Sequence, residues 1–173
     1  MTTNINAYPL ETGNDELERY ALEECIRRQR LDHHTSVLIL PAARCELARR
    51  FAQLGACVTL GDDPARRQDI EGRILAAGFS SEVCFTPCPL AELPDTLPGE
   101  PFDIIMVRRG LCQLPYEQAR QVVRWLLLKL RIGGKLYVSI HGLHSELSDD
   151  YNACEQPVDM RYAALAPAMT NRY

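Results

Sequence analysis

The chain has 173 residues, of which 46% are hydrophobic and 24% charged, and this is the size and composition of one ordinary globular domain. Its net charge of −4 argues against a general binder of nucleic acids or anionic membranes, since both favour a basic protein surface. Its seven cysteines are scattered, odd in number and mostly in apolar segments, which is typical of a reducing compartment rather than of a disulfide framework.

The sequence shows no targeting pattern. Residues 1–13 lack both the charged leader and the apolar centre of a signal peptide. No run approaches the roughly 18 apolar residues that a membrane-spanning helix needs. We therefore expect a cytoplasmic protein whose residues 1–13 form a flexible lead-in.

The first half of the chain predicts alternating helices and strands. Asn14 or Asp15 can cap a helix that runs to about Arg30. The following elements are expected as a strand at Val37–Leu40, a helix ended by Gly55, a strand at Cys57–Leu60, a helix at Ala65–Ala77 ended by Gly78, and a short strand at Val83–Phe85.

The second half continues the alternation. A proline-rich loop, Pro94–Pro101, leads into the apolar strand Phe102–Val107. A long helix is expected from Pro115 to about Leu130, then a turn at Gly133-Gly134 and a strand at Lys135–Ile140. Together these elements predict an α/β fold of three layers, Rossmann-like, with a parallel sheet in the order 3-2-1-4-5 and helices on both faces.

The stretch Ser36–Pro64 carries the most specific pattern. A strand, a loop, an amphipathic helix and a second strand follow one another, and Asp62 stands just past the second strand. This order is that of a nucleotide-binding unit, in which an acid about 20 residues after the loop meets a ribose hydroxyl.

The pattern resembles the first half of the class I S-adenosylmethionine (SAM)-dependent methyltransferases, whose loop reads roughly Val-Leu-Asp-x-Gly-x-Gly-x-Gly. On that pattern the loop acid is replaced by Ile39, and the three glycines by Pro41, Ala43 and Cys45. Only Asp62 keeps its expected residue type. The resemblance thus implies a cofactor pocket formed by Asp62, Pro41, Ala43 and Arg108, in a vestigial form.

The lost glycines have physical consequences. Glycine accepts a positive φ and lets a ligand approach the backbone, whereas proline fixes φ and has no N–H to offer. A cost of about 1 kcal/mol for each ill-fitting residue and each lost hydrogen bond predicts SAM binding that is tens- to a thousand-fold weaker.

The second half also resembles this family, in the stretch FDIIMVRRGLCQLP and in LLLKLRIGGKLYVSIHG. The resemblance covers residues 14–142, which we expect to be one methyltransferase-like domain followed by an irregular extension over 143–173. The family fold normally adds two antiparallel strands after the fifth strand, and the extension shows no such pair. We therefore expect a shortened fold, or a fragment of a longer protein.

Several other residues are candidate ligands, each with an alternative. Asp62 is a ribose ligand or, with Asp63, a turn and helix cap. Arg108 and Arg109 follow the fourth strand and can bind a carboxylate or phosphate, or pair with a nearby acid such as Asp62 or Asp63. Cys84 and Cys88 could bind zinc, and His141 and His144 could bind a metal or act as a general base. Neither pair has further ligands identified beside it, so we expect ordinary structural or surface residues at both.

Two functional hypotheses remain open. The favoured one is a methyltransferase-like domain with impaired or lost SAM binding that acts as a binding or regulatory module. The alternative is an active SAM-dependent methyltransferase that acts on a small molecule. Because the run Trp125–Leu128 is more apolar than one buried stripe requires, we also expect a protein partner or a homodimer, bound through the helix of Trp125 or the edge of the fifth strand.

Overall fold

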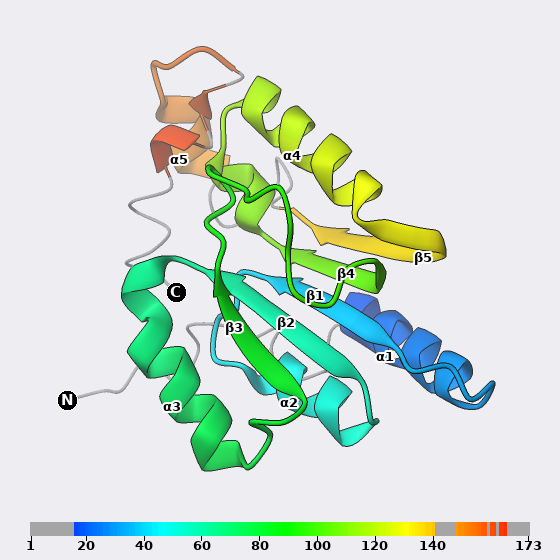
Figure 1. The fold of residues 1–173 in the computed structure, drawn as a ribbon. Coiled ribbons are helices and arrows are strands. Elements are labelled where there is room, and N and C mark those ends of the chain that lie inside the picture. Colours follow the sequence, from blue (N-terminus) through cyan, green and yellow to red (C-terminus); the bar gives the residue numbers. More distant parts are fainter. Residues whose placement is uncertain (1–15, 141–147, 159, 162, 166–173) are drawn as a thin grey trace.

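A computed structural model describes residues 16–140, 148–158, 160, 161 and 163–165. Residues 1–13, the pair His141 and His144, and part of the extension lie outside the described residues. The described chain forms one parallel sheet with helices on both faces (Figure 1).

The sheet has the strand order β3-β2-β1-β4-β5, and every pairing is parallel. The sequence prediction of a Rossmann-like α/β fold in the order 3-2-1-4-5 is therefore confirmed. The strands are β1 (Ser36–Leu40), β2 (Cys57–Asp62), β3 (Val83–Pro87), β4 (Phe102–Arg108) and β5 (Leu130–Ser139).

The helices connect these strands. They are α1 (Glu16–Gln29), α2 (Glu46–Gln53), the short 3₁₀ helix η2 (Pro64–Arg66), α3 (Arg67–Ala77), the 3₁₀ helix η3 (Gly110–Gln113), α4 (Tyr116–Leu128) and α5 (Ser148–Ala153). The last of these lies within the extension, where Tyr151 is buried.

Alternation along the strands separates the core into two parts. On one face, Ile39, Leu60 and Met106 pack against α1, α2 and α3 through residues such as Phe51 and Ile70. On the other face the helical cover comes from α4. The buried residues of this second part of the core include Leu38, Leu40, Ile105, Val107, Val122 and Leu126.

The connection from β3 to β4 crosses this second face as a loop rather than as a helix (Figure 1). Cys88 and Leu97 belong to the buried cluster of this face. Lys129 holds the loop near α4 by donating to the Asp95 carbonyl and pairing with Glu100. The first part of this connection, Cys88–Ala91, forms part of the wall at the carboxyl ends of β2 and β3.

The Gly133-Gly134 pair differs from its predicted role as a turn. β5 already begins at Leu130, which lies opposite Phe102, and the register then shifts between Phe102 and Ile104. A Cβ at Gly134 would lie 3.0 Å from the Phe102 carbonyl oxygen. The glycines therefore permit a bulge inside β5, because only a residue without a side chain fits against β4 there.

Candidate functional site

A cavity of about 270 Å³ lies at the carboxyl ends of the central strands. The strand order reverses between β1 and β4, and ligands of open α/β sheets bind at such a switch point. The cavity is lined by Leu40, Pro41, Gly61, Asp62, Asp63, Cys88, Pro89, Leu90, Ala91, Gly110, Gln113 and Leu114.

Two residues of the loop after β1 have the positive φ that favours glycine. Ala43 has a φ of 48° and Cys45 a φ of 67°, both in the left-handed region. These are two of the three positions where the resembling family has glycine. Since a side chain in this region is strained by about 1–2 kcal/mol, these two residues lower the stability of the loop.

Three backbone groups of this loop are hydrogen-bonded within the protein. Pro41 has no N–H, and the amide of Ala42 donates to Oδ2 of Asp62 at 3.0 Å. The amide of Cys45 donates to the Ala42 carbonyl at 3.0 Å. The Ala43 carbonyl accepts a hydrogen bond of 2.5 Å from Nη2 of Arg66.

Asp62 is the last residue of β2 rather than the residue just past it, and its carboxylate is engaged on both oxygens. Oδ2 accepts from Nη1 of Arg66 at 2.7 Å as well as from Ala42, and Oδ1 accepts from the amide of Asp63 at 2.8 Å. Only 11% of this side chain is exposed. A ribose hydroxyl would therefore compete with Arg66 for Asp62.

Asp63 has the capping role that the sequence offered as an alternative. Its Oδ1 accepts from the amide of Ala65 at 2.8 Å, and Pro64 follows it at the start of η2. The two neighbouring acids thus have separate functions, since Asp63 caps the 3₁₀ helix while Asp62 faces the loop after β1.

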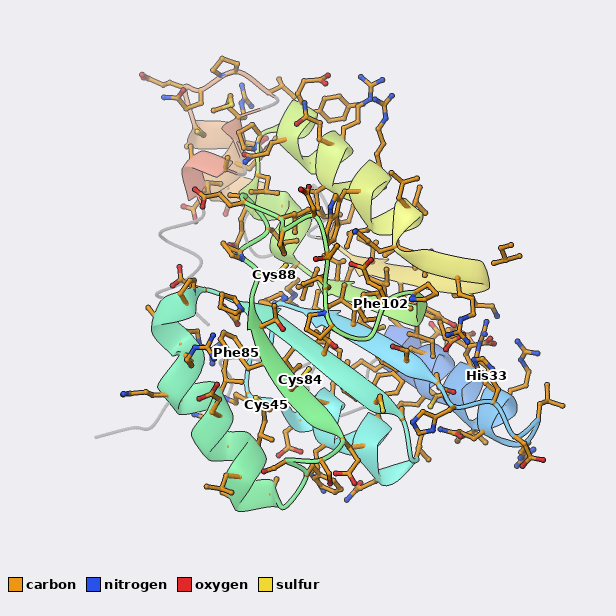
Figure 2. The ribbon with its side chains drawn as sticks, in the orientation of Figure 1. His33, Cys45, Cys84, Phe85, Cys88 and Phe102 are labelled. Carbon is orange, nitrogen blue, oxygen red and sulfur yellow. The ribbon has the colours of Figure 1, made fainter. Side chains whose placement is uncertain are left out.

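The opposite wall of the cavity is apolar and closely packed. A Cβ at Gly61 would clash with the Leu40 side chain and lie 3.0 Å from the Cβ of Cys88, and a Cβ at Gly110 would clash with Leu90. Burial raises the pKa of the Cys88 thiol to about 11, so this thiol stays protonated at neutral pH. Cys88 therefore contributes a small apolar surface at the end of β3 (Figure 2).

Arg108 pairs with an acid, as the alternative reading of the sequence allowed, but the acid is neither Asp62 nor Asp63. Its Nη2 lies 3.0 Å from Oε1 of Glu18 on α1, and both side chains are almost fully buried. Arg109 has a φ of 56°, and its amide donates to the Ser139 carbonyl. No local pattern in the sequence pointed to Glu18, because it lies 90 residues from its partner in the chain.

The remaining candidates lie away from this cavity's lining. Ile39 is buried among the residues that face α1 and α2, and Cys84 is an exposed residue of β3. Trp125 is half-buried against the second core face, with Nζ of Lys129 4.9 Å from its ring centre. Leu127 and Leu128, which follow it, are the exposed part of the apolar run.

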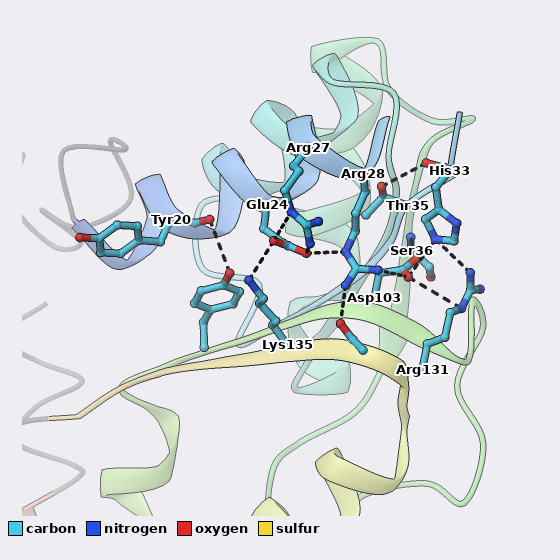
Figure 3. Close-up of polar contacts among 12 residues, drawn as sticks. Tyr20, Glu24, Arg27, Arg28, His33, Thr35, Ser36, Asp103, Arg131 and Lys135 are labelled. Carbon is cyan, nitrogen blue, oxygen red and sulfur yellow. Dashed lines mark hydrogen bonds and ion pairs between the residues drawn. The ribbon is translucent and has the colours of Figure 1, made fainter. Parts of the chain in front are cut away.

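A second group of charges lies at the amino end of the sheet, and sequence analysis missed it. Asp103 is fully buried and accepts from Nη1 of Arg28 at 2.9 Å and from the amide of Ser36 at 2.9 Å (Figure 3). His33 lies 2.9 Å from the same carboxylate. This cluster joins α1, β1 and β4, and its position opposite the cavity gives it a structural role.

Glu24 extends the cluster along α1. Burial raises the pKa of its carboxyl, but hydrogen bonds from Arg27, Lys135 and Arg28 outweigh this effect and hold the pKa at about 2. Lys135 lies on β5, so Glu24 connects the first helix to the last strand of the sheet (Figure 3).

Comparison with solved structures supports the fold of the class I methyltransferases. The chain is similar to an O-methyltransferase family protein from Burkholderia thailandensis, with a TM-score of 0.60, 16% identity, and coverage of 85% of this chain and 45% of the other. It is also similar to PigF, solved with SAH, with a TM-score of 0.55, 15% identity, and coverage of 78% and 41%. The chain thus spans less than half the length of these two proteins.

A Staphylococcus aureus protein assigned as a caffeoyl-CoA O-methyltransferase is nearer in length, with coverage of 96% of this chain and 89% of the other. Its TM-score is 0.58 and its identity is 12%. At these identities the comparison establishes a methyltransferase-like Rossmann fold. No protein-family model matches the sequence, and neither does any curated protein sequence.

Within the described part of the chain, no group of three or more His, Cys, Asp or Glu side chains is arranged to hold a metal ion. None of the helices described here combines the length and apolar character that a membrane span requires.

Proposed function

We propose that this chain is a methyltransferase-like domain that binds SAM weakly or not at all and acts as a binding or regulatory module. The observation that carries the proposal is the engagement of Asp62. Its carboxylate already accepts from Arg66 and from the amide of Ala42, and Arg66 also holds the Ala43 carbonyl. The groups that a cofactor needs are therefore bound to one another.

The cavity suits the nucleoside half of the cofactor better than the whole molecule. Its volume of about 270 Å³ lies just below the roughly 300–1,000 Å³ of common small-molecule pockets. Leu90, Cys88 and Leu114 offer an apolar surface for an adenine ring, and Asp62 lies where a ribose would be held. These residues fit an adenosine group.

The residues present do not fit the amino-acid half of the cofactor. Pro41 offers no N–H, and the amides of Ala42 and Cys45 are already used. The buried guanidinium of Arg108 is paired with Glu18, so it is not available as a simple partner for a carboxylate. We therefore derive no methyl-transfer step for this chain.

An active SAM-dependent methyltransferase acting on a small molecule is the second candidate. The positive φ values of Ala43 and Cys45 favour it, because two of the three positions where the family has glycine adopt a conformation typical of glycine. Arg66 is 31% exposed, so a ligand can displace it from Asp62 at a modest cost. The solved neighbours, PigF with SAH among them, also favour this candidate.

The proposed role as a binding module also requires a surface that contacts another protein. Leu128 is 83% exposed and Ile132 fully so, and they lie four residues apart where α4 passes into β5. We propose a second copy of this chain as the occupant, because full burial of each such side chain contributes about 1.5–3 kcal/mol and a two-fold interface buries each one twice.

Calorimetric titration separates the two candidates. We expect SAM and S-adenosylhomocysteine to bind with dissociation constants weaker than about 100 μM, or to give no heat of binding. Adenosine is the informative third ligand, since it carries only the group that fits, and we expect it to bind at least as well as SAM. Low-micromolar SAM binding would overturn the first proposal and support the enzyme.

A further inference from the structure

The two exposed cysteines differ in their surroundings. All seven cysteines lie in the described part of the chain and all are free thiols; Cys57 and Cys84 are exposed, Cys154 is partly exposed and the other four are buried. Sγ of Cys57 lies 3.1 Å from Nε2 of His34, whereas Sγ of Cys84 lies 3.6 Å from the Thr59 hydroxyl. Only the first of these pairs joins a thiol to a base.

The backbone holds the pair together from two strands. Cys57 begins β2, and its amide donates to the Thr35 carbonyl at 2.9 Å. Thr35 is fully buried and adjoins His34 in the chain, just before β1. The imidazole and the thiol therefore meet because β1 and β2 start side by side, while both side chains stay open to solvent.

We propose that Cys57 is a site of thiol modification, in which His34 acts as the base and a small disulfide is the reagent. His34 takes the thiol proton on Nε2, in the tautomer that carries its own hydrogen on Nδ1. The Cys57 thiolate attacks one sulfur of the disulfide, and a new S–S bond forms as the old one breaks. The departing thiolate takes the proton from His34, so Cys57 is oxidised and the other half of the reagent is reduced.

The product is a mixed disulfide rather than an internal bridge. Cys84 lies opposite Thr59, two residues along from Cys57. With strands about 4.8 Å apart and about 3.3 Å per residue, the two Cα atoms are separated by roughly 8 Å. This exceeds the roughly 7 Å limit for a disulfide without backbone movement. The buried thiols do not compete, and burial holds the pKa of Cys25 and Cys88 at about 11.

The test compares the two exposed thiols within one sample. Iodoacetamide at pH 7, followed by peptide mass spectrometry over time, gives the alkylation rates of Cys57 and Cys84 together. We expect Cys57 to react at least about fivefold faster, because Nε2 of His34 lies 3.1 Å from its sulfur and can take the thiol proton during the reaction. His34→Gln keeps a polar side chain but removes the base, so it should abolish this advantage and leave Cys84 unchanged.

Glutathione disulfide is the second reagent. We expect Cys57 to gain one glutathione before Cys84 does, and dithiothreitol to remove it. Cys57→Ser, a small change at an exposed position, should lose this modification. Equal alkylation rates for the two thiols, or an unchanged Cys57 rate in His34→Gln, would overturn the proposal.

Discussion

Arg66 donates a hydrogen bond of 2.7 Å to the Asp62 carboxylate, at the position where the resembling family meets the cofactor ribose. The same guanidinium reaches the Ala43 carbonyl. One partly exposed arginine thus connects the end of β2 to the loop after β1, and it can be replaced without disturbing the core.

Replacing Arg66 should improve ligand binding. In Arg66→Ala the Asp62 carboxylate loses its ion pair and can accept from a ribose hydroxyl, so we expect adenosine to bind about three- to tenfold more tightly, since one charge-assisted hydrogen bond is worth about 1 kcal/mol or more. Calorimetry measures the change. Arg67→Ala is the matched control, because Arg67 pairs with Glu71 and is an exposed neighbour. Equal adenosine affinities in the two variants would show that Arg66 does not compete with the ligand for Asp62.

Glycine at position 43 should relieve strain in the loop. Ala43 has a φ of 48°, so Ala43→Gly should raise the free energy of unfolding by up to about 1 kcal/mol. Ala42, the adjacent buried alanine, is absent from the positive-φ residues and serves as the control. Ala42→Gly should instead lower stability by about 0.5–1 kcal/mol. Urea unfolding compares the two, and a loss of stability in both variants would contradict the strain argument.

Gly61 should be intolerant of a methyl group. In Gly61→Ala the new Cβ meets the buried Leu40 side chain and Cys88, which should cost about 1–3 kcal/mol and narrow the cavity. Gly72, inside α3, has nothing within 4 Å of such a Cβ. Gly72→Ala should therefore stabilise the protein by about 0.5–1 kcal/mol through helix propensity. Thermal unfolding checks the opposite signs, and a neutral Gly61→Ala would show that the wall is not tightly packed.

Acid should weaken the link between α1 and β5. The pKa of Glu24 falls from 4.5 to about 2 in the folded protein, since three basic side chains outweigh the effect of burial. The contribution of Glu24 to the free energy of unfolding is fully present above pH 4.5 and is lost as the pH falls toward 2. In this range the unfolded state binds a proton at Glu24 more readily than the folded state does. Glu24→Gln should flatten the fall in stability over this range.

Urea midpoints between pH 5 and pH 2.5 measure this effect. Glu23→Gln is the control on the same helix, since Glu23 is exposed and pairs only loosely with Arg19 at 3.8 Å. It should keep the wild-type slope. A wild-type slope in Glu24→Gln as well would mean that other carboxylates carry the acid sensitivity.

Self-association should depend on the apolar residues at the junction of α4 and β5. We expect sedimentation of the wild-type chain to show a dimer at tens of micromolar, and Leu128→Ser to shift it toward monomer. Leu75 is similarly exposed, at 72% against 83% for Leu128, but lies on α3. Leu75→Ser is therefore the control. A wild-type monomer at these concentrations would contradict the proposed interface.

The sequence by itself determined the order of the strands and the place of Asp62 near the end of β2. Apolar runs such as Phe102–Val107 and caps such as Gly78 act locally, so periodicity and turn residues reveal them. The spacing of Asp62 from β1 likewise follows from the strand–helix–strand unit. The pattern of missing glycines marked three positions as ill-fitting, and two of them, Ala43 and Cys45, have a positive φ while Pro41 does not.

Only the tertiary structure decided which charges meet. Asp62 binds Arg66, Arg108 binds Glu18, and the buried Asp103 binds Arg28, each from a different element of the chain. Asp62 and Asp63 are neighbours in the sequence, but Asp62 pairs with Arg66 while Asp63 accepts from the Ala65 amide. A charge takes the counter-ion that packing brings within about 3 Å in a desolvated setting, and this depends on how helices lie on the sheet. Local patterns carry no record of that geometry, which is why the sequence predicted the place of Asp62 but not the ion pair that occupies its carboxylate.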